Sequence, residues 1–176
     1  MVRGCSTLTG KDVMMGYFIR NIPMDAKILD AGFGGGTIGR FLKQYGYKNV
    51  DGLDVYDKEL EGLCLQNVYR NIFFCDMRTF EYDNYDTIIF GDSLEHITLE
   101  DAKKLLEQLI NKVSNIIISV PYMQPMKSIS NNPHDEHLQP TINQEYMKEN
   151  YPYLELLYED EMKDYKGIIG VYVWSK

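Results

Sequence analysis

Short apolar runs separated by polar stretches mark the first two thirds of the chain. Five of these runs have the length and the flanking turn residues of buried strands: residues 27–32, 49–55, 72–75, 86–90 and 115–120. Two later runs, at residues 153–162 and 167–174, predict strands that pair as a hairpin across residues 163–167. The pattern therefore predicts five strands in succession and a closing hairpin.

Helical spacing fills two of the intervals between the early strands. The first helix is predicted by apolar residues spaced i, i+3, i+4 and i+7, and it ends at Gly46; these residues are Ile38, Phe41, Leu42 and Tyr45. Residues 58–66 predict a second, shorter helix. Strand, glycine-rich turn and helix thus follow one another at the start of the predicted fold.

Capping-box spacing predicts the starts of two later helices. Thr98 and Asp101 precede a segment with one apolar face, and Thr141 and Gln144 precede the last predicted helix. Strands that alternate with helices predict an α/β fold with a doubly wound, mostly parallel sheet and an antiparallel edge near the C-terminal end. We expect one domain over residues 1–176, with residues 1–26 as a helical lid segment and 27–176 as the core.

Residues 28–39 read ILDAGFGGGTIG, with five glycines in twelve positions after the first strand. Glycines at such a turn let a ligand approach the backbone closely. Gly34, Gly36 and Gly39 match the dinucleotide spacing G-x-G-x-x-G, which alone is weak evidence. Asp30 lies at the end of the strand, where a carboxylate repels a pyrophosphate and attracts a cationic group. The acid therefore favours a ligand with a sulfonium or an amino group.

Composition and charge limit the classes of binding partner that are expected. The chain has 176 residues, 44% of them hydrophobic, and a net charge of -8. This balance is typical of a folded domain, and it disfavours nucleic acid or an anionic membrane as partner. The first fifteen residues lack an apolar leader core, and no apolar window of about 18 residues occurs. We expect a soluble cytoplasmic protein.

In the order of its motifs, the chain resembles the class I S-adenosylmethionine-dependent methyltransferases from about residue 27 to residue 176. The matching stretches are ILDAGFGGG, GLDVYD, CDM, IIFGDSLEHI and NIIISVPY. The first is fairly specific, and the later ones carry weight because they follow in the family's order. The resemblance implies a seven-stranded sheet of order 3-2-1-4-5-7-6 with strand 7 antiparallel and helices on both faces. It also implies S-adenosylmethionine as cofactor and S-adenosylhomocysteine as product.

The resemblance assigns the cofactor contacts to residues at the ends of four strands. Asp30 would hold the amino group of the methionine part, Asp54 both ribose hydroxyls, and Asp76 the adenine amino group. The remaining implied contacts are Gly32, Phe33, Gly34, Gly36, Val55, Met77 and Asp92. Each acid also has a structural interpretation, since Asp is common as a turn or cap residue.

Histidine is a natural base for a hydroxyl nucleophile, and the chain has three, His96, His134 and His137. All three are candidate catalytic residues, although His96 fits equally well as a structural residue of its loop. His134 and His137 lie in the polar segment SNNPHDEHLQPT after the fifth strand. Their H-D-x-H spacing, perhaps with Asp92, also suits a metal, but a loop fixes no geometry from sequence. We therefore assign no metal ligand.

The acceptor is expected to be a small molecule methylated at oxygen or nitrogen. Segments 8–18, 92–99 and 121–140 are short, and the family's nucleobase motif N/D-P-P-Y is missing after the fourth strand, where the chain has GDSL. Methylation of a protein or nucleic acid remains an alternative, as does a cofactor-binding subunit without chemistry of its own. A nicotinamide-dependent reductase is disfavoured by Asp30. The sequence leaves the oligomeric state open.

Overall fold

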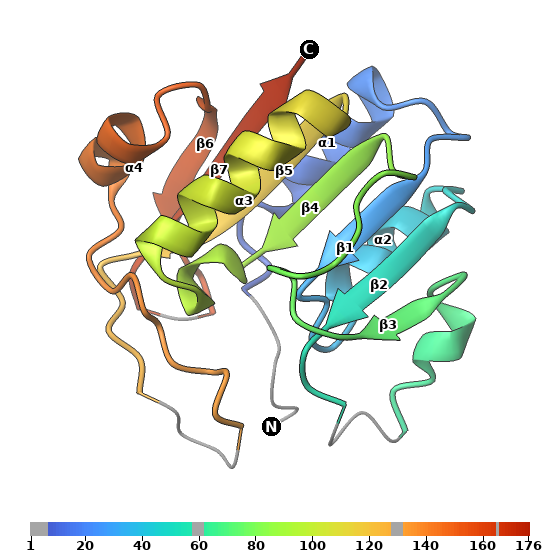
Figure 1. Ribbon diagram of the computed structural model, residues 1–176, viewed down its shortest axis with the longest axis horizontal. Coiled ribbons are helices and arrows are strands. Elements are labelled where there is room, and N and C mark those ends of the chain that lie inside the picture. Colours follow the sequence, from blue (N-terminus) through green and yellow to red (C-terminus); the bar gives the residue numbers. More distant parts are fainter. Residues whose placement is uncertain (1–6, 58–61, 128–131, 165) are drawn as a thin grey trace.

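Seven strands form one sheet in the computed structural model, which describes residues 7–57, 62–127, 132–164 and 166–176. The strands are β1 (Ile28–Ala31), β2 (Val50–Asp54), β3 (Ile72–Phe74), β4 (Thr87–Gly91), β5 (Asn115–Tyr122), β6 (Glu155–Glu161) and β7 (Ile168–Ser175). Their order across the sheet is β3-β2-β1-β4-β5-β7-β6 (Figure 1). The predicted fold class and strand order are confirmed.

The direction of the strands defines where a ligand is expected. β1 pairs in parallel with β2 and β4, and β5 continues the parallel set beside β4. β7 lies between β5 and β6 and is antiparallel to both. Because the chain proceeds from β1 to β2 and later returns to β4 on the other side, the strand order reverses beside β1. Ligands of open α/β sheets bind at the carboxyl ends of the strands at such a reversal.

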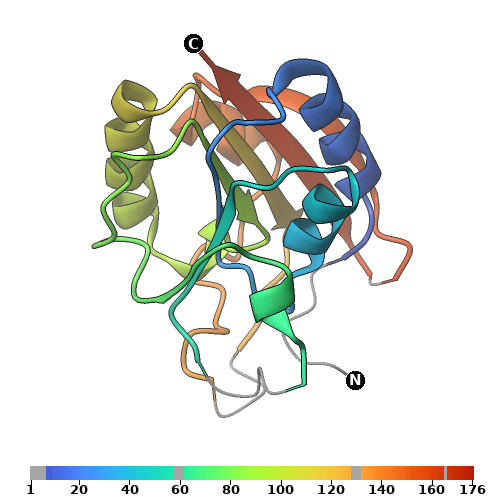
Figure 2. The same cartoon turned by 90° about the vertical axis from the view of Figure 1, so that its right-hand side faces the viewer.

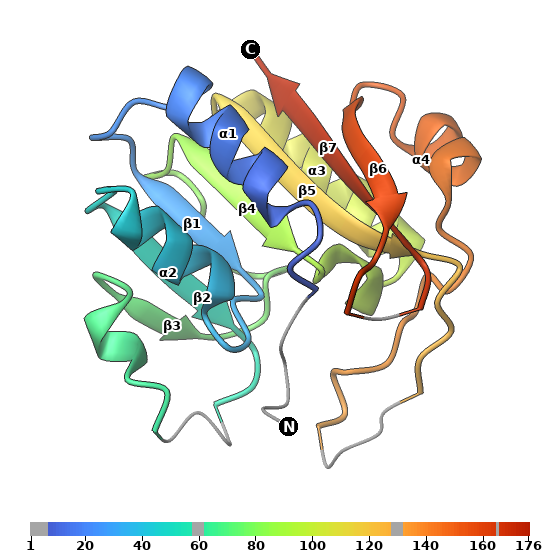
Figure 3. The ribbon, with the colours of Figure 1, turned by 180° about the vertical axis from the view of Figure 1, so that it is seen from behind.

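Helices cover both faces of the sheet. α1 (Lys11–Asn21) and α2 (Thr37–Gln44) lie on one face, and α3 (Leu99–Lys112) lies on the other (Figures 2 and 3). α4 (Gln144–Asn150) contributes Met147 to the apolar cluster that also contains the buried leucines of α3. α1 is anchored to the sheet face by Met14, Met15 and Phe18, all of which are buried.

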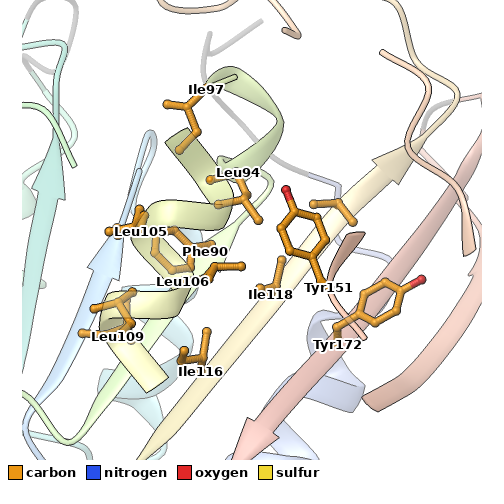
Figure 4. Packing of buried hydrophobic residues seen from close by; sticks show 14 of the residues in the cluster. Phe90, Leu94, Ile97, Leu105, Leu106, Leu109, Ile116, Ile118, Tyr151 and Tyr172 are labelled. Carbon is orange, nitrogen blue, oxygen red and sulfur yellow. The ribbon is translucent and has the colours of Figure 1, made fainter. Parts of the chain in front are cut away.

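α3 shows how the capping signal and the apolar face act together. The Thr98 hydroxyl accepts a hydrogen bond from the Asp101 amide at 3.2 Å, so the predicted N-cap is confirmed. The helix then turns its leucines toward β4, β5 and β7, where they meet Phe90 and Ile118 (Figure 4). This packing fixes the segment between β4 and α3, which carries several of the predicted site residues.

Two predicted helix boundaries differ in the structure. Of the helix expected at residues 58–66, residues 58–61 lie outside the described residues, and the rest forms a turn and the short 3-10 helix Leu65–Asn67. α4 begins after Asn143, whose side chain accepts from the Tyr146 amide at 2.7 Å, so Thr141 is not its cap. Asn is as good a cap as Thr and lies next to the first helical residue.

None of the described helices has the length and apolar composition needed to cross a membrane.

Candidate functional site

The turn between β1 and α2 adopts backbone angles that favour glycine. Gly32, Gly34 and Gly36 have φ values of 81°, 48° and 75°, all in the left-handed region. The Gly32 amide donates to the Leu53 carbonyl at 2.7 Å, which ties the turn to β2. A Cβ atom at Gly32 would overlap the side chain of Ser93, so glycine also permits close approach of the loop after β4. We call residues 32–36 the glycine loop.

Asp30 precedes the glycine loop and is 1% exposed. Its Oδ2 accepts a hydrogen bond from the Tyr69 hydroxyl at 2.7 Å, while its Oδ1 has no partner among the described residues. Burial raises the pKa of Asp30 to about 6, even though the bond from Tyr69 opposes the shift. Tyr69 fits here because Gly39 in α2 has no side chain; a Cβ there would overlap the tyrosine ring. A buried carboxyl with an unused oxygen is suited to a cationic ligand group.

Asp54 ends β2 with its carboxylate held by two amides. Oδ2 accepts from Gly34 at 2.9 Å and Oδ1 from Tyr56 at 3.0 Å. Burial raises the pKa of this carboxyl, and the two amides oppose the rise. Each carboxylate oxygen keeps a further lone pair, so the group is oriented and still able to accept from a diol. Val55 beside it is 38% exposed.

The predicted adenine contacts have mixed surroundings. Arg78 binds Asp76 through its side chain, with Nε at 2.9 Å from Oδ1, and the Arg78 amide donates to the same oxygen at 2.8 Å. These bonds lower the pKa of Asp76. Met77 accepts from the Tyr82 hydroxyl through its carbonyl at 2.7 Å. Phe33 is buried against Tyr69. Asp76 is thus already paired with a cation.

Asp92, at the carboxyl end of β4, belongs to a buried polar cluster that includes the start of α1. The Lys11 amine lies 3.0 Å from Asp92 Oδ1 and 2.6 Å from the Ser119 hydroxyl, and Ser119 also donates to Asp92. Lys11 is 1% exposed, and Asp92 has a left-handed backbone with φ 54°. Strain at a non-glycine residue is often found at functional sites.

Glu95, His96 and His137 gather beside this ion pair. The two imidazole rings meet edge to face with centroids 4.8 Å apart, and His137 Nε2 lies 4.0 Å from Glu95 Oε1. Burial raises the pKa of Glu95 well above its usual value, and the Asp92 charge adds to the rise. Burial lowers the pKa of His96 and of His137, and the two rings are therefore expected to be neutral near pH 7.

The loop that carries His137 is fastened by Gln139. This side chain is buried, donates to the Leu94 and Ile97 carbonyls at 3.0 Å each, and accepts from the hydroxyls of Tyr146 and Tyr151. The amides of residues 138 and 139 also donate to the Glu95 carbonyl. Gln139 thus satisfies its full hydrogen-bonding capacity and fixes the loop against the segment after β4.

The two histidines of this loop have separate surroundings. His134 lies near Asp54 and Asp76, where a positive charge opposes the rise in the pKa of Asp54 and adds to the lowering of the pKa of Asp76. His137 instead contacts His96 and Glu95. The pairing of His134 with His137 in a metal cluster, suggested by their spacing, is therefore not what the structure forms.

An open groove of about 670 Å³ lies away from these residues. It is bordered by α4, β6 and β7, with Tyr122 and Tyr172 at its floor joined through their hydroxyls. No residue of the glycine loop and none of the acids described above lines it. The polar residues at the carboxyl ends of β1, β2 and β4 are the better site candidate, because acids with shifted pKa values lie there beside the glycine loop.

The structure brings Asp30, Asp54 and the glycine loop together at one end of the sheet, and Asp92, His96 and His137 beside them. Four residues of this region were not singled out by the sequence: Lys11, Tyr69, Glu95 and Gln139. Gly39, a glycine inside a predicted helix, was a usable signal for a bulky neighbour such as Tyr69. The other three carried no local signal.

Comparison with known proteins bears on the fold. No protein-family model matches the chain, and no curated protein is found to be similar. Among solved structures, the chain is similar to 1,6-didemethyltoxoflavin-N1-methyltransferase of Burkholderia thailandensis, with a TM-score of 0.70 and 14% identity over 99% of this chain and 79% of that one.

Two further solved structures are similar. Magnesium protoporphyrin IX methyltransferase of Synechocystis PCC 6803 has a TM-score of 0.64 and 18% identity over 94% of this chain and 78% of that one. The bifunctional kinase-methyltransferase WbdD has a TM-score of 0.67 and 16% identity, over 96% of this chain and 39% of that one. At such identities the likeness bears on the fold alone. The chain has the fold of the class I methyltransferases.

Proposed function

We propose that the protein is an S-adenosylmethionine-dependent methyltransferase that acts on a small-molecule acceptor at oxygen or nitrogen. The observation that carries the proposal is the buried Asp30, two residues before the glycine loop, whose Oδ1 has no hydrogen-bond partner within the part of the chain that the structure describes. A nicotinamide dinucleotide would bring a pyrophosphate to this turn, where the carboxylate repels it. An amino acid ammonium or a sulfonium is attracted instead.

The residues present fit this cofactor. Asp30 Oδ1 is a buried acceptor without a donor among the described residues, and the methionine amino group would supply one. Asp54 is oriented by the amides of Gly34 and Tyr56 and keeps lone pairs for the ribose diol. Val55 and Met77 would line the adenine. Asp76 would accept from the adenine amine with a lone pair that Arg78 leaves unused.

The bound cofactor supplies a methyl group on a cationic sulfur, and the protein has to align it with the acceptor and exclude water. Asp92 and Lys11 lie at the carboxyl end of β4 beside the glycine loop, where they would orient the polar end of an acceptor. His96 and His137 are neutral imidazoles that can accept a proton from a hydroxyl or amine. His134, near Asp54, would contact the acceptor from the loop side.

The solved structures support the acceptor class. The Burkholderia thailandensis enzyme was crystallised with 1,6-didemethyltoxoflavin and S-adenosylhomocysteine, and the Synechocystis enzyme with bound SAM. Both are named for small-molecule substrates. Because the segments that surround the carboxyl ends of the present sheet are short, a small acceptor also suits this chain.

Thermal unfolding tests the cofactor. A ligand that binds the folded state alone stabilises it by about 2.7 kcal/mol at a hundredfold excess over its Kd. S-adenosylhomocysteine should therefore raise Tm, and NADH should leave it unchanged. The opposite ranking would reject the proposal.

A matched pair of variants then tests the site. Asp54→Ala removes the ribose acceptor and should weaken S-adenosylhomocysteine binding by about 1.5–3 kcal/mol. Asp57→Ala, an exposed acid three residues later, should bind as the wild type does. Equal affinities for both variants in calorimetric titration would remove Asp54 from the site. Turnover is then sought with a panel of hydroxyl- and amine-bearing metabolites followed by mass spectrometry; cofactor binding without any methylated product would favour a non-catalytic subunit.

A further inference from the structure

A cluster of three metal-binding residue types lies beside the proposed methyl-transfer site. Glu95, His96 and His137 each offer one donor atom, and these atoms lie within 4.8 Å of one another. The Glu95 and His96 side chains come from the segment between β4 and α3, and His137 comes from the loop after β5. The packing of two separate segments thus creates a geometry that no single stretch of sequence displays.

A backbone carbonyl holds each imidazole ring in its orientation. His137 Nδ1 lies 2.7 Å from the Gln124 carbonyl, and His96 Nδ1 lies 3.2 Å from the Glu136 carbonyl. A carbonyl oxygen is an acceptor only, so each Nδ1 carries the proton and each Nε2 keeps its lone pair. A backbone carbonyl on the far nitrogen is the arrangement that orients histidine ligands in metal sites.

Glu95 gives an independent reason to expect a ligand at this point. Its side chain is 1% exposed, and Oε2 has no hydrogen-bond partner among the described residues. Oε1 is 4.0 Å from His137 Nε2, which is too long for a hydrogen bond. Beside the neutral rings of His96 and His137, this buried carboxyl group has no positive partner in direct contact among the described residues. A divalent cation between the three groups would satisfy all of them.

We propose that Glu95, His96 and His137 form a binding site for one divalent transition-metal ion. With the ion bound, His96 and His137 would be ligands and not proton acceptors, so the ion would take over that role in the proposed function. The existence of the site does not depend on that function. Two imidazoles and one carboxylate are a donor set for Zn²⁺ and for Fe²⁺, Co²⁺ or Mn²⁺, whereas Mg²⁺ and Ca²⁺ favour oxygen donors throughout.

The three residues leave coordination positions open. Ligand atoms lie about 2.0–2.2 Å from zinc, which puts two tetrahedral ligands about 3.4 Å apart. The widest separation within the cluster, up to 4.8 Å, must therefore shorten by about 1.4 Å on binding. Rotation of the side chains supplies that change. The open positions would hold water or an oxygen atom of the acceptor, and a metal ion makes the proton of such a group easier to remove.

A titration of untagged, chelator-treated protein with Co²⁺ tests the site, because the visible absorption of this ion reports its ligands. We expect one equivalent to bind. Glu95→Gln preserves the shape of the side chain and removes its charge, and His137→Ala removes one imidazole. Each variant should raise the Kd for Co²⁺ by at least about tenfold, the lower end of what loss of a residue that only hydrogen-bonds to a metal ligand produces. The same order is expected in competition with Zn²⁺.

His134→Ala is the matched control, since it removes a histidine of the same loop that lies outside the cluster. It should bind Co²⁺ as the wild type does. Wild-type protein gives a second reading that needs no variant: two exchangeable ring N–H protons should show large paramagnetic shifts in the NMR spectrum of the Co²⁺ complex. Failure of the wild type to bind Co²⁺, an unchanged Kd in both ligand variants, or absence of shifted ring protons would each overturn the proposal. S-adenosylhomocysteine binding, measured on the same samples, separates this result from the proposed function.

Discussion

The two halves of the site are built from different kinds of groups. The proposed cofactor half, made of the glycine loop with Asp30 and Asp54, relies on backbone amides and on positive φ angles at a strand-to-helix turn. The proposed acceptor half consists of side chains from α1, from the segment after β4 and from the loop after β5, namely Lys11, Asp92, Glu95, His96 and His137. Local backbone geometry defines the first half, and long-range packing defines the second.

The starts of the helices show the same contrast. α2 begins at Gly36 with no side-chain cap, so the amides of its first turn remain available to a ligand. α3 and α4 begin at Thr98 and Asn143, whose side chains occupy the corresponding amides. α1 and α2 thus start without a side-chain cap, whereas α3 and α4 start with one.

The largest expected effect comes from the buried cation of the acceptor half. Lys11→Met keeps most of the side-chain volume but leaves Asp92 and Ser119 without their amine, and removal of one partner of a buried ion pair costs about 3–5 kcal/mol. Lys112→Met, which breaks an exposed pair with Asp83, should cost about 0–1 kcal/mol. Urea unfolding compares the two. A small loss in Lys11→Met would mean that the acceptor half is not held by this pair.

The next effect concerns the pH dependence of the cofactor half. Because the pKa of Asp30 in the folded protein, about 6, lies above its ordinary value of 3.8, the folded state binds the extra proton. This carboxyl therefore lowers stability as pH rises from about 4 through 6, by on the order of 3 kcal/mol in total. Asp30→Asn removes the dependence, so its stability relative to the wild type should increase by that amount between pH 4 and pH 7.

Chemical denaturation at several pH values measures the difference. The same variant should lose affinity for S-adenosylhomocysteine, because it lacks the charge that attracts the amino group. A stability difference that does not change with pH would show that the carboxyl titrates normally in the folded protein.

A smaller effect is expected at Gly39, where the cofactor half depends on the absence of a side chain. Gly39→Ala places a methyl group against the Tyr69 ring, which has to move and loosen its bond to Asp30. Overpacking of this kind costs about 1–3 kcal/mol. Gly16→Ala in α1 has open space around it and should instead stabilise the protein by about 0.5–1 kcal/mol. Similar changes in both variants would indicate that helix propensity, and not the tyrosine contact, sets the outcome.

The smallest effect tests the closed helix starts. Thr98→Ala removes the acceptor for the Asp101 amide and should cost about 1 kcal/mol. Thr141→Ala, at the position that resembles a cap in sequence but is not one, should change stability by no more than about 0.5 kcal/mol. Thermal unfolding of the two variants tests whether the observed hydrogen bond at Thr98, and not the capping-box spacing that both threonines share, determines the loss of stability.

The sequence predicted what local chemistry determines. Strand positions, the glycine loop and the acid at the end of β2 follow from runs of apolar residues and from turn residues, which act over a few positions. Lys11 could not be identified, because its partners Asp92 and Ser119 are far along the chain and a single lysine in a polar segment has no periodicity. The grouping of His137 with His96 depends in the same way on how Gln139 fastens one loop to another.

The position of β7 within the sheet also determines when the sheet can be completed during synthesis. Its residues are made after those of both neighbouring strands, yet it forms the bridge between β5 and β6. Until residues 168–175 have left the ribosome, the apolar strand NIIISVPY exposes an unpaired edge, which is prone to associate with other chains. Because these contacts join distant parts of the chain, their formation is expected to be slow. Strand β6 is made before β7 and is rich in Glu and Asp. This negative charge disfavours association of β6 with other chains until β7 pairs with it.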